Sequence, residues 1–249
     1  MDSHQLLART NEVYENLQTY SDVGKVESPD VPGPGIEFQT FFKRPMLFKF
    51  RWLAWHPYFG KSKPASENMV STNGLRFQSL FHEQIREHES LSIMVAGATG
   101  ISRSSVHLML NMLAPNSIVL NQYWNQMTNP TLLPDEQVNG ADCFHVTGST
   151  KKGGQSEAWL EKETFLIRRL REQSVITREM ADRMTDHNQS TKNIESFRAM
   201  AEKAGLLPDS INLALEHMAE PVKPRTFEHV YDYTTVSINQ DIANSVFEL

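Results

Sequence analysis

The stretch that decides the fold is residues 38–52, which read Phe38-Gln39-Thr40-Phe41-Phe42-Lys43-Arg44-Pro45-Met46-Leu47-Phe48-Lys49-Phe50-Arg51-Trp52. After the proline, apolar side chains alternate with Lys49 and Arg51, and this period of two is typical of a strand that buries one face. Because proline cannot donate to a sheet ladder, it belongs at a strand start, an edge or a bulge. We therefore predict two strands, broken at Lys43-Arg44-Pro45, in a curved sheet whose aromatic face covers either a packed core or a cavity for an apolar ligand.

The rest of the chain predicts more strands around a helical start. An apolar stripe with Ser3 as N-cap predicts a helix over residues 3–20. Asn73-Gly74 and Asn139-Gly140 are strong hairpin signals. Further strands are expected at Val23–Val26, Ser156–Glu161, Thr164–Leu170 and Thr226–Ile238. Strands that follow one another through short turns predict an antiparallel meander rather than parallel units.

Two other segments carry helical spacing. Residues 89–114 are apolar, and Gly97 and Gly100 are expected to divide them into two helices. Residues 171–218 are expected to form two or three helices, with breaks near His187-Asn188 and Gly205–Pro208. The second segment is then a helical insertion before the last strand.

Composition limits the function classes. The chain has 249 residues, 39% of them hydrophobic, a formal net charge of −6 and one cysteine, Cys143. This content allows a substantial core, and the negative charge argues against a nucleic-acid binder. No run approaches the roughly 20 apolar residues of a membrane-spanning helix. A single cysteine excludes an internal disulfide and a cysteine-rich zinc site, and Cys143 in an alternating strand is expected to be a small buried side chain.

Catalytic motifs are weak in this chain. Residues 97–102 are glycine-rich but lack the ending of a phosphate-binding P-loop. Ser102, Ser104 and Ser105 stand near His107, without the strand–turn–helix elbow that positions a serine nucleophile. No histidine pair has zinc-protease spacing. We expect no catalytic residue, no metal site and no cofactor.

Four segments, in this order, resemble the LolA-like periplasmic lipoprotein-carrier superfamily. They are Leu17-Gln18-Thr19-Tyr20, Lys43-Arg44-Pro45-Met46-Leu47-Phe48, Val70-Ser71-Thr72-Asn73-Gly74, and residues 158–169. The resemblance implies an α+β fold: an incomplete antiparallel β-barrel with helices lidding its concave face. It implies a single domain over residues 1–249, with residues 171–224 as a helical insertion that the small carrier lacks and that could plug the concavity. It also implies a periplasmic location, after removal of a signal peptide.

The resemblance also suggests site residues. Carried over by position, Arg44 is the arginine that hydrogen-bonds the lid and gates the cavity; the alternative is an arginine without a role in ligand exchange. The expected ligand-binding residues are Phe42, Met46, Phe48, Phe50, Trp52 and Phe77. The alternative for this aromatic face is an ordinary sheet-to-helix core.

The favoured function is therefore that of a non-enzymatic envelope protein that binds a lipid, an acyl chain or a lipoprotein in a hydrophobic concavity. The first alternative is a protein-interaction or sensor module of the same fold, with a filled concavity and an envelope protein as its partner. The second is a hydrolase, which requires a serine or cysteine within hydrogen-bond reach of a histidine. Neither nucleic acid nor a membrane span is expected.

Overall fold

The computed structural model describes residues 1–249 except 31–34, 55–65, 82, 116–126, 151–153 and 204–207. Its strands form one antiparallel sheet in the order β6-β5-β4-β3-β2-β1-β11-β10-β9-β8-β7. The strands are β1 Thr19–Glu27, β2 Ile36–Lys43, β3 Leu47–Ala54, β4 Ser66–Thr72, β5 Phe77–Phe81, β6 Gln84–His88, β7 Thr128–Val138, β8 Ala141–Ser149, β9 Gln155–Glu161, β10 Ile167–Ile176 and β11 Arg225–Ile238. The helices are α1 Ser3–Asn16, α2 Leu91–Thr99, α3 Ser105–Leu113, α4 Arg178–Gln189, α5 Thr191–Lys203, α6 Pro208–Ala219 and the 3-10 helix η3 Asn244–Phe247.

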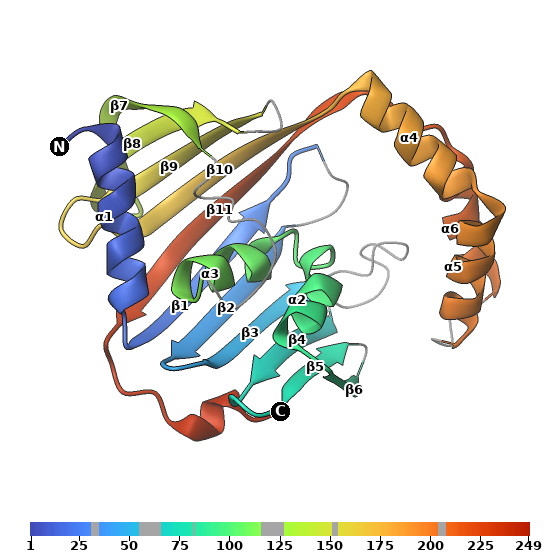
Figure 1. Cartoon of the computed structure of the whole chain (residues 1–249), viewed down its shortest axis with the longest axis horizontal. Coiled ribbons are helices and arrows are strands. Elements are labelled where there is room, and N and C mark those ends of the chain that lie inside the picture. Colours follow the sequence, from blue (N-terminus) through green and yellow to red (C-terminus); the bar gives the residue numbers. More distant parts are fainter. Residues whose placement is uncertain (31–34, 55–65, 82, 116–126, 151–153, 204–207) are drawn as a thin grey trace.

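The sheet is open, because β6 and β7 are its two edges and do not pair with each other. Figure 1 shows it curving around α1, α2 and α3. Apolar residues of these helices and of the inner strand face form one buried cluster. The fold is thus an α+β incomplete antiparallel barrel with helices on its concave face, which confirms the fold class expected from the sequence.

Several element boundaries differ from the prediction. Helix α1 ends at Asn16, because Leu17 has an extended backbone and β1 starts at Thr19. The first strand is accordingly longer than the Val23–Val26 segment expected. The break between α2 and α3 runs from Gly100 to Ser104, and Gly97 lies inside α2. The Asn-Gly turns occur where they were expected, with left-handed backbone at Gly74 and at Asn139-Gly140.

The helices α4, α5 and α6 continue from the β10–β11 hairpin. Residues 171–176, expected in the helical segment, belong instead to β10, so the helices begin at Arg178. They pack against one another and stand beyond the end of these two strands (Figure 1). The predicted break near His187-Asn188 falls at Ser190, between α4 and α5, and the break at Gly205–Pro208 lies largely outside the described residues. The helices on the concave face are α1, α2 and α3. The inserted helices α4, α5 and α6 therefore do not fill the concavity, which was one possibility raised by the sequence.

Candidate functional site

The concave face carries a wall of aromatic side chains on β2 and β3. Alternation turns Phe38 inward on β2, and Phe48, Phe50 and Trp52 inward on β3, and all four are at most 2% exposed. Phe38 stacks on Phe50 with ring centroids 5.4 Å apart, and Phe50 lies 5.7 Å from Trp52. The wall continues to Phe81, whose ring centroid lies 5.9 Å from that of Trp52. Such contacts add to the energy of burial alone.

A glycine on β1 makes room for this wall. Gly24 pairs with Phe38, and a Cβ at residue 24 would lie 2.5 Å from Phe38 Cζ and 2.7 Å from the carbonyl oxygen of Asp232. The Phe38 ring therefore lies over residue 24, and its edge meets Tyr233 of β11 at 5.8 Å between centroids. The absence of a side chain at Gly24 joins the aromatic surfaces of β2 and β11.

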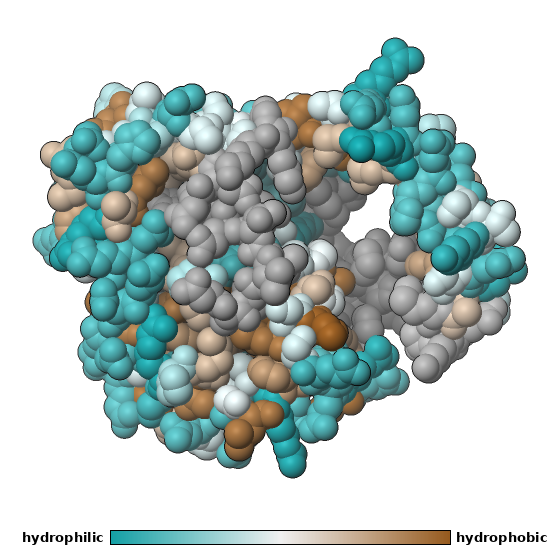
Figure 2. Space-filling view, in the orientation of Figure 1, coloured by the Kyte–Doolittle hydropathy of each residue, from teal (hydrophilic) through white to brown (hydrophobic). Residues whose placement is uncertain are grey.

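Helices α2 and α3 cover the concave face. Ser90 caps α2, where its hydroxyl accepts from the backbone N–H of Ile93. Every residue of α3 is buried, which is the behaviour expected of a helix surrounded by protein on all sides. By contrast, α2 keeps Ile93 51% exposed, and the turn after it keeps Ile101 41% exposed. Apolar atoms are correspondingly visible around α2 in Figure 2.

Arg44 connects the sheet to the ends of two helices. Its side chain donates to the carbonyl oxygens of Glu15 (2.6 Å) and Leu17 (3.1 Å) at the end of α1, and to that of Leu113 (2.9 Å) at the end of α3. The guanidinium also lies 5.2 Å from the centre of the Phe42 ring. A cation is favourable at a helix C-terminus, where carbonyl groups lack partners within the helix. One side chain thus joins the β2–β3 turn, α1 and the covering helix α3.

A buried carboxyl group interrupts the apolar face. Asp22 is 3% exposed; its Oδ1 accepts from the backbone N–H of Thr40 (3.0 Å), and its Oδ2 accepts from the Tyr20 hydroxyl (2.9 Å). Burial raises the pKa of Asp22 to about 7, against the hydrogen bonds from Thr40 and Tyr20, which lower it. Burial likewise raises the pKa of the Tyr20 hydroxyl well above its usual value. The concave face therefore contains a polar cluster within its aromatic wall.

The structure brings the sequence-predicted ligand-binding residues together. Phe42, Phe48, Phe50 and Trp52 are buried in the main apolar cluster, and Met46 and Phe77 pack against it while partly exposed. Arg44 lies at the rim of this face, on the helix ends described above.

Sequence reasoning missed the polar part of this face. Tyr20, Asp22 and Tyr233 point inward beside the aromatic wall, in register with residues of β2 across β1. The alternation of Tyr20, Asp22, Gly24 and Val26 was a usable signal. It was overlooked because the first strand was placed four residues too late.

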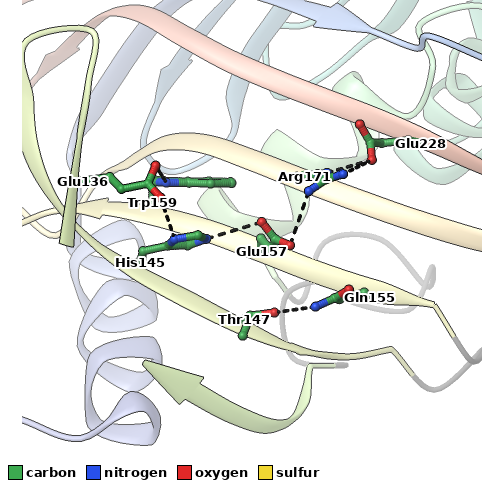
Figure 3. Close-up of polar contacts among 8 residues, drawn as sticks. All are labelled: Glu136, His145, Thr147, Gln155, Glu157, Trp159, Arg171 and Glu228. Atoms are coloured by element: carbon green, nitrogen blue, oxygen red, sulfur yellow. Dashed lines mark hydrogen bonds and ion pairs between the residues drawn. The ribbon is translucent and has the colours of Figure 1, made fainter. Parts of the chain in front are cut away.

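The opposite face of the sheet carries a cross-strand polar network (Figure 3). His145 stacks on Trp159 with ring centroids 4.2 Å apart, and the Trp159 indole N–H donates to Glu136 at 3.0 Å. Two carboxylates flank His145, those of Glu136 and Glu157, at 3.3 and 3.4 Å. Beside them, Arg171 pairs with Glu228 at 2.6 Å and with Glu157 at 3.5 Å. Cross-strand pairs of this kind stabilise a sheet, and we assign the network that role.

Two serine–histidine contacts bear on the hydrolase alternative. Ser28 hydrogen-bonds His229 Nδ1, and Ser79 hydrogen-bonds His88 Nε2 at 2.7 Å. Burial lowers the pKa of His229, and the nearby Arg103 cation lowers it further. The charged group that acts on His229 is thus a cation. A catalytic triad instead has a carboxylate that orients the histidine, so this contact does not support the hydrolase alternative. Of the serines expected near His107, Ser102 and Ser105 donate to backbone carbonyls of Thr99 and Ser102.

The described residues bear on the expectations for a metal site, a membrane-spanning helix and the single cysteine. Among the described residues, no group of three His, Cys, Asp or Glu side chains is arranged to hold a metal ion. In the same part of the chain, no helix combines the length and the apolar character needed to cross a bilayer. Cys143 is a buried free thiol, as predicted, and burial raises its pKa to about 11.

Comparisons with known proteins give structural likenesses at low identity. No protein-family model matches the chain, and no curated protein matches it. Solved structures that resemble it include the MucA/MucB complex of Pseudomonas aeruginosa (11% identity, 99% of this chain, TM-score 0.44). They also include the lipoprotein LppX of Mycobacterium tuberculosis (10% identity, 68% of this chain and 87% of that one, TM-score 0.42). A third is a LolA superfamily protein from Nitrosomonas europaea (11% identity, 100% of this chain and 98% of that one, TM-score 0.32).

The chain spans about 60% of the length of the MucB chains that it matches. One of these solved structures, the protein from Nitrosomonas europaea, is a member of the LolA superfamily, which the sequence also resembles.

Proposed function

We propose that this chain is a non-enzymatic envelope protein, periplasmic in location, that binds a lipid, an acyl chain or the acyl chains of a lipoprotein on its concave face. The observation that carries the proposal is the continuous aromatic wall of β2 and β3 beneath the apolar helices α2 and α3. Apolar ligand sites are built from such walls with a few polar groups among them. In this proposal α2 and α3 occupy the ligand's place until they move.

The contacts of the covering helices support such a movement. The α2–α3 segment meets the sheet through apolar side chains, and these contacts have no fixed direction, so an acyl chain can replace them. A directional link is the hydrogen bond from Arg44 to Leu113. Another directional link is the hydrogen bond from the Tyr231 hydroxyl of β11 to the carbonyl oxygen of Arg103 in the α2–α3 turn. Displacing the segment therefore breaks these hydrogen bonds and exchanges one apolar surface for another. Arg44 is the gate residue of this proposal.

The test measures ligand uptake directly. The protein is exported to a bacterial periplasm, purified and analysed by native mass spectrometry with organic extraction. Uptake of the apolar fluorophore diphenylhexatriene is then measured for the wild type, for Phe50→Ser in the wall, and for Leu75→Ser at a residue that is 89% exposed. We expect lipid in the extract, probe uptake by the wild type and by Leu75→Ser, and reduced uptake by Phe50→Ser. A clean apo mass without probe uptake contradicts the proposal.

A second candidate is a protein-interaction or sensor module whose concavity is permanently filled. The observation that favours it is α3, which is buried along its whole length. This candidate predicts that the α2–α3 segment never leaves the sheet. Amide hydrogen exchange separates the two: exchange of α3 only on global unfolding supports the filled module, whereas faster local exchange supports the carrier.

A further inference from the structure

Two large aromatic residues of the concave face each contain a buried polar atom that has no hydrogen-bond partner among the described residues. These atoms are the indole nitrogen Nε1 of Trp52 on β3 and the hydroxyl oxygen of Tyr233 on β11. Both residues are 1% exposed. Phe38 lies between them, because it pairs with Trp52 on one side and its ring meets Tyr233 on the other. Buried polar groups nearly always have partners, and leaving one unpaired is costly, so two on one face need an explanation.

A third unpartnered group belongs to the covering helix. Asn111 of α3 is buried, and neither its amide nitrogen nor its amide oxygen has a partner. An asparagine amide provides two donors and an acceptor. Both the wall and the helix that covers it therefore contain buried hydrogen-bonding capacity that the chain itself leaves unused.

The Tyr233 hydroxyl lies near the Asp22 cluster. Burial raises the pKa of this hydroxyl well above its usual value, and the neighbouring Asp22 carboxyl raises it further. The two oxygens of Asp22 already accept from Tyr20 and from Thr40.

The charges of this region decide which head group fits. Asp22 of β1 and Glu172 of β10 are buried acidic residues, and both raise the pKa of the Tyr233 hydroxyl. An anionic head group would lose its hydration beside these acidic residues, and burying a charge without a counter-charge is costly. The oxygens of Asp22 already have hydrogen-bond donors, so a cation would find no free carboxylate. An uncharged group that both donates and accepts matches the Tyr233 hydroxyl and the Trp52 indole N–H.

We propose that the concave face contains a head-group subsite, formed by Tyr233 and Trp52, for an amphiphile with an uncharged hydroxyl, ester or amide head. This inference rests on the proposed function and adds the ligand class to it. The acyl chain lies along the aromatic wall, and the head group forms hydrogen bonds with the atoms that lack partners. The subsite favours a glycerol ester over a free fatty acid of the same chain length.

The experiment compares ligands that share one chain and differ in the head. Binding of monooleoylglycerol, oleate and oleylamine is measured by competition with diphenylhexatriene on the full chain. We expect the wild type to bind monooleoylglycerol most tightly. Tyr233→Phe and Trp52→Phe should each weaken its binding roughly 5- to 10-fold relative to the binding of diphenylhexatriene by the same variant, the effect of one hydrogen bond. Tyr233→Phe should be at least as stable as the wild type, because it removes an unpaired buried hydroxyl.

Two matched controls come from satisfied neighbours. Tyr231 lies on the same strand and face as Tyr233, but its hydroxyl donates to the carbonyl oxygen of Arg103 at 2.9 Å. Trp159 lies on the opposite face, and its indole nitrogen donates to Glu136. Tyr231→Phe and Trp159→Phe should keep the preference for monooleoylglycerol.

The outcomes separate the two proposals. Failure of the wild type to bind diphenylhexatriene or any of the three lipids overturns the proposed function and the subsite with it. Binding of diphenylhexatriene without a preference among the heads overturns the subsite alone. A preference that survives in Tyr233→Phe and in Trp52→Phe also overturns the subsite, since the two atoms then serve no ligand.

Discussion

Arg44 donates from Nη2 to the carbonyl oxygen of Leu113 at 2.9 Å, which links the β2–β3 turn to the last residue of α3. The same nitrogen lies 2.6 Å from the carbonyl oxygen of Glu15 in α1. The helix that covers the concave face is therefore joined at one end, through one guanidinium group, to both the sheet and the N-terminal helix. A change at Arg44 should affect the position of α3 before it affects the strands.

We expect Arg44→Leu to lower the free energy of unfolding by about 2 kcal/mol, because it leaves helix-terminal carbonyls without their charged donor. It should also speed the release of bound diphenylhexatriene, since α3 loses its link to the rim. Chemical denaturation and stopped-flow fluorescence measure the two effects. The matched control is Arg51→Leu, whose exposed guanidinium bonds Gln39 and should contribute less than about 0.5 kcal/mol. Equal release rates in wild type and Arg44→Leu would remove the gate role.

We expect Phe50→Ala to lower the free energy of unfolding by about 3–5 kcal/mol, because the ring is fully buried between Phe38 and Trp52. Leu53→Ala is the control on the opposite face of the same strand, where the side chain is 44% exposed, and it should cost about 1 kcal/mol or less. Urea denaturation measures both. A cost below about 1 kcal/mol for Phe50→Ala would mean that the ring is not part of the packed core.

We expect Gly24→Ala to destabilise the protein by more than about 2 kcal/mol, because the new methyl group would overlap Phe38 and the backbone carbonyl of Asp232. The phenyl ring can move aside, but the carbonyl group is held in the ladder between β1 and β11. Gly97→Ala is the matched control: its Cβ would meet nothing within 4 Å, and alanine favours the helix by roughly 0.5–1 kcal/mol. The midpoint temperature of thermal unfolding should thus fall for Gly24→Ala and rise for Gly97→Ala. A neutral Gly24→Ala would contradict the close packing over β1.

We expect Asp22 to make the protein less stable as the pH rises from about 4 to about 8. Its pKa is about 7 in the folded protein and near 3.8 in the unfolded chain, so the unfolded chain ionises first. The free energy of unfolding should therefore fall across this interval, by at most about 4 kcal/mol from this group, and should level off above pH 7. The nearby tyrosine hydroxyls of Tyr14, Tyr20 and Tyr233 have raised pKa values and stay neutral throughout.

Asp22→Asn isolates this effect, because every other titrating group is the same in both proteins. Urea denaturation at about pH 4, 6 and 8 should show similar stabilities in acid and a growing advantage for the asparagine variant toward pH 8. If the free energy of unfolding changed with pH by the same amount in the wild type and in Asp22→Asn, Asp22 would not remain protonated in the fold.

The period-two alternation of residues 46–52 was enough to predict β3 and its buried face, and Asn73-Gly74 and Asn139-Gly140 were enough to predict two turns. These signals are local, because side chains of a strand alternate and an Asn-Gly pair adopts the left-handed backbone of a tight turn whatever surrounds it. Cys143 was placed in the interior by the same alternation. The resemblance to a known superfamily added two expectations: that the strands form an incomplete barrel, and that Arg44 hydrogen-bonds the lid.

The sequence by itself determined β3 with its buried face, the two Asn-Gly turns, and the apolar character of α2 and α3. Tertiary structure decided which helices lie on the concave face: α1, α2 and α3 cover it, while α4, α5 and α6 extend beyond β10 and β11. It also decided that Gly24 admits the Phe38 ring and that Asp22 is buried beside Tyr20, because these depend on the pairing of β1 with both β2 and β11. Contacts between residues as distant as Arg44 and Leu113 arise only when the sheet has curved around its helices, and no local pattern encodes that distance.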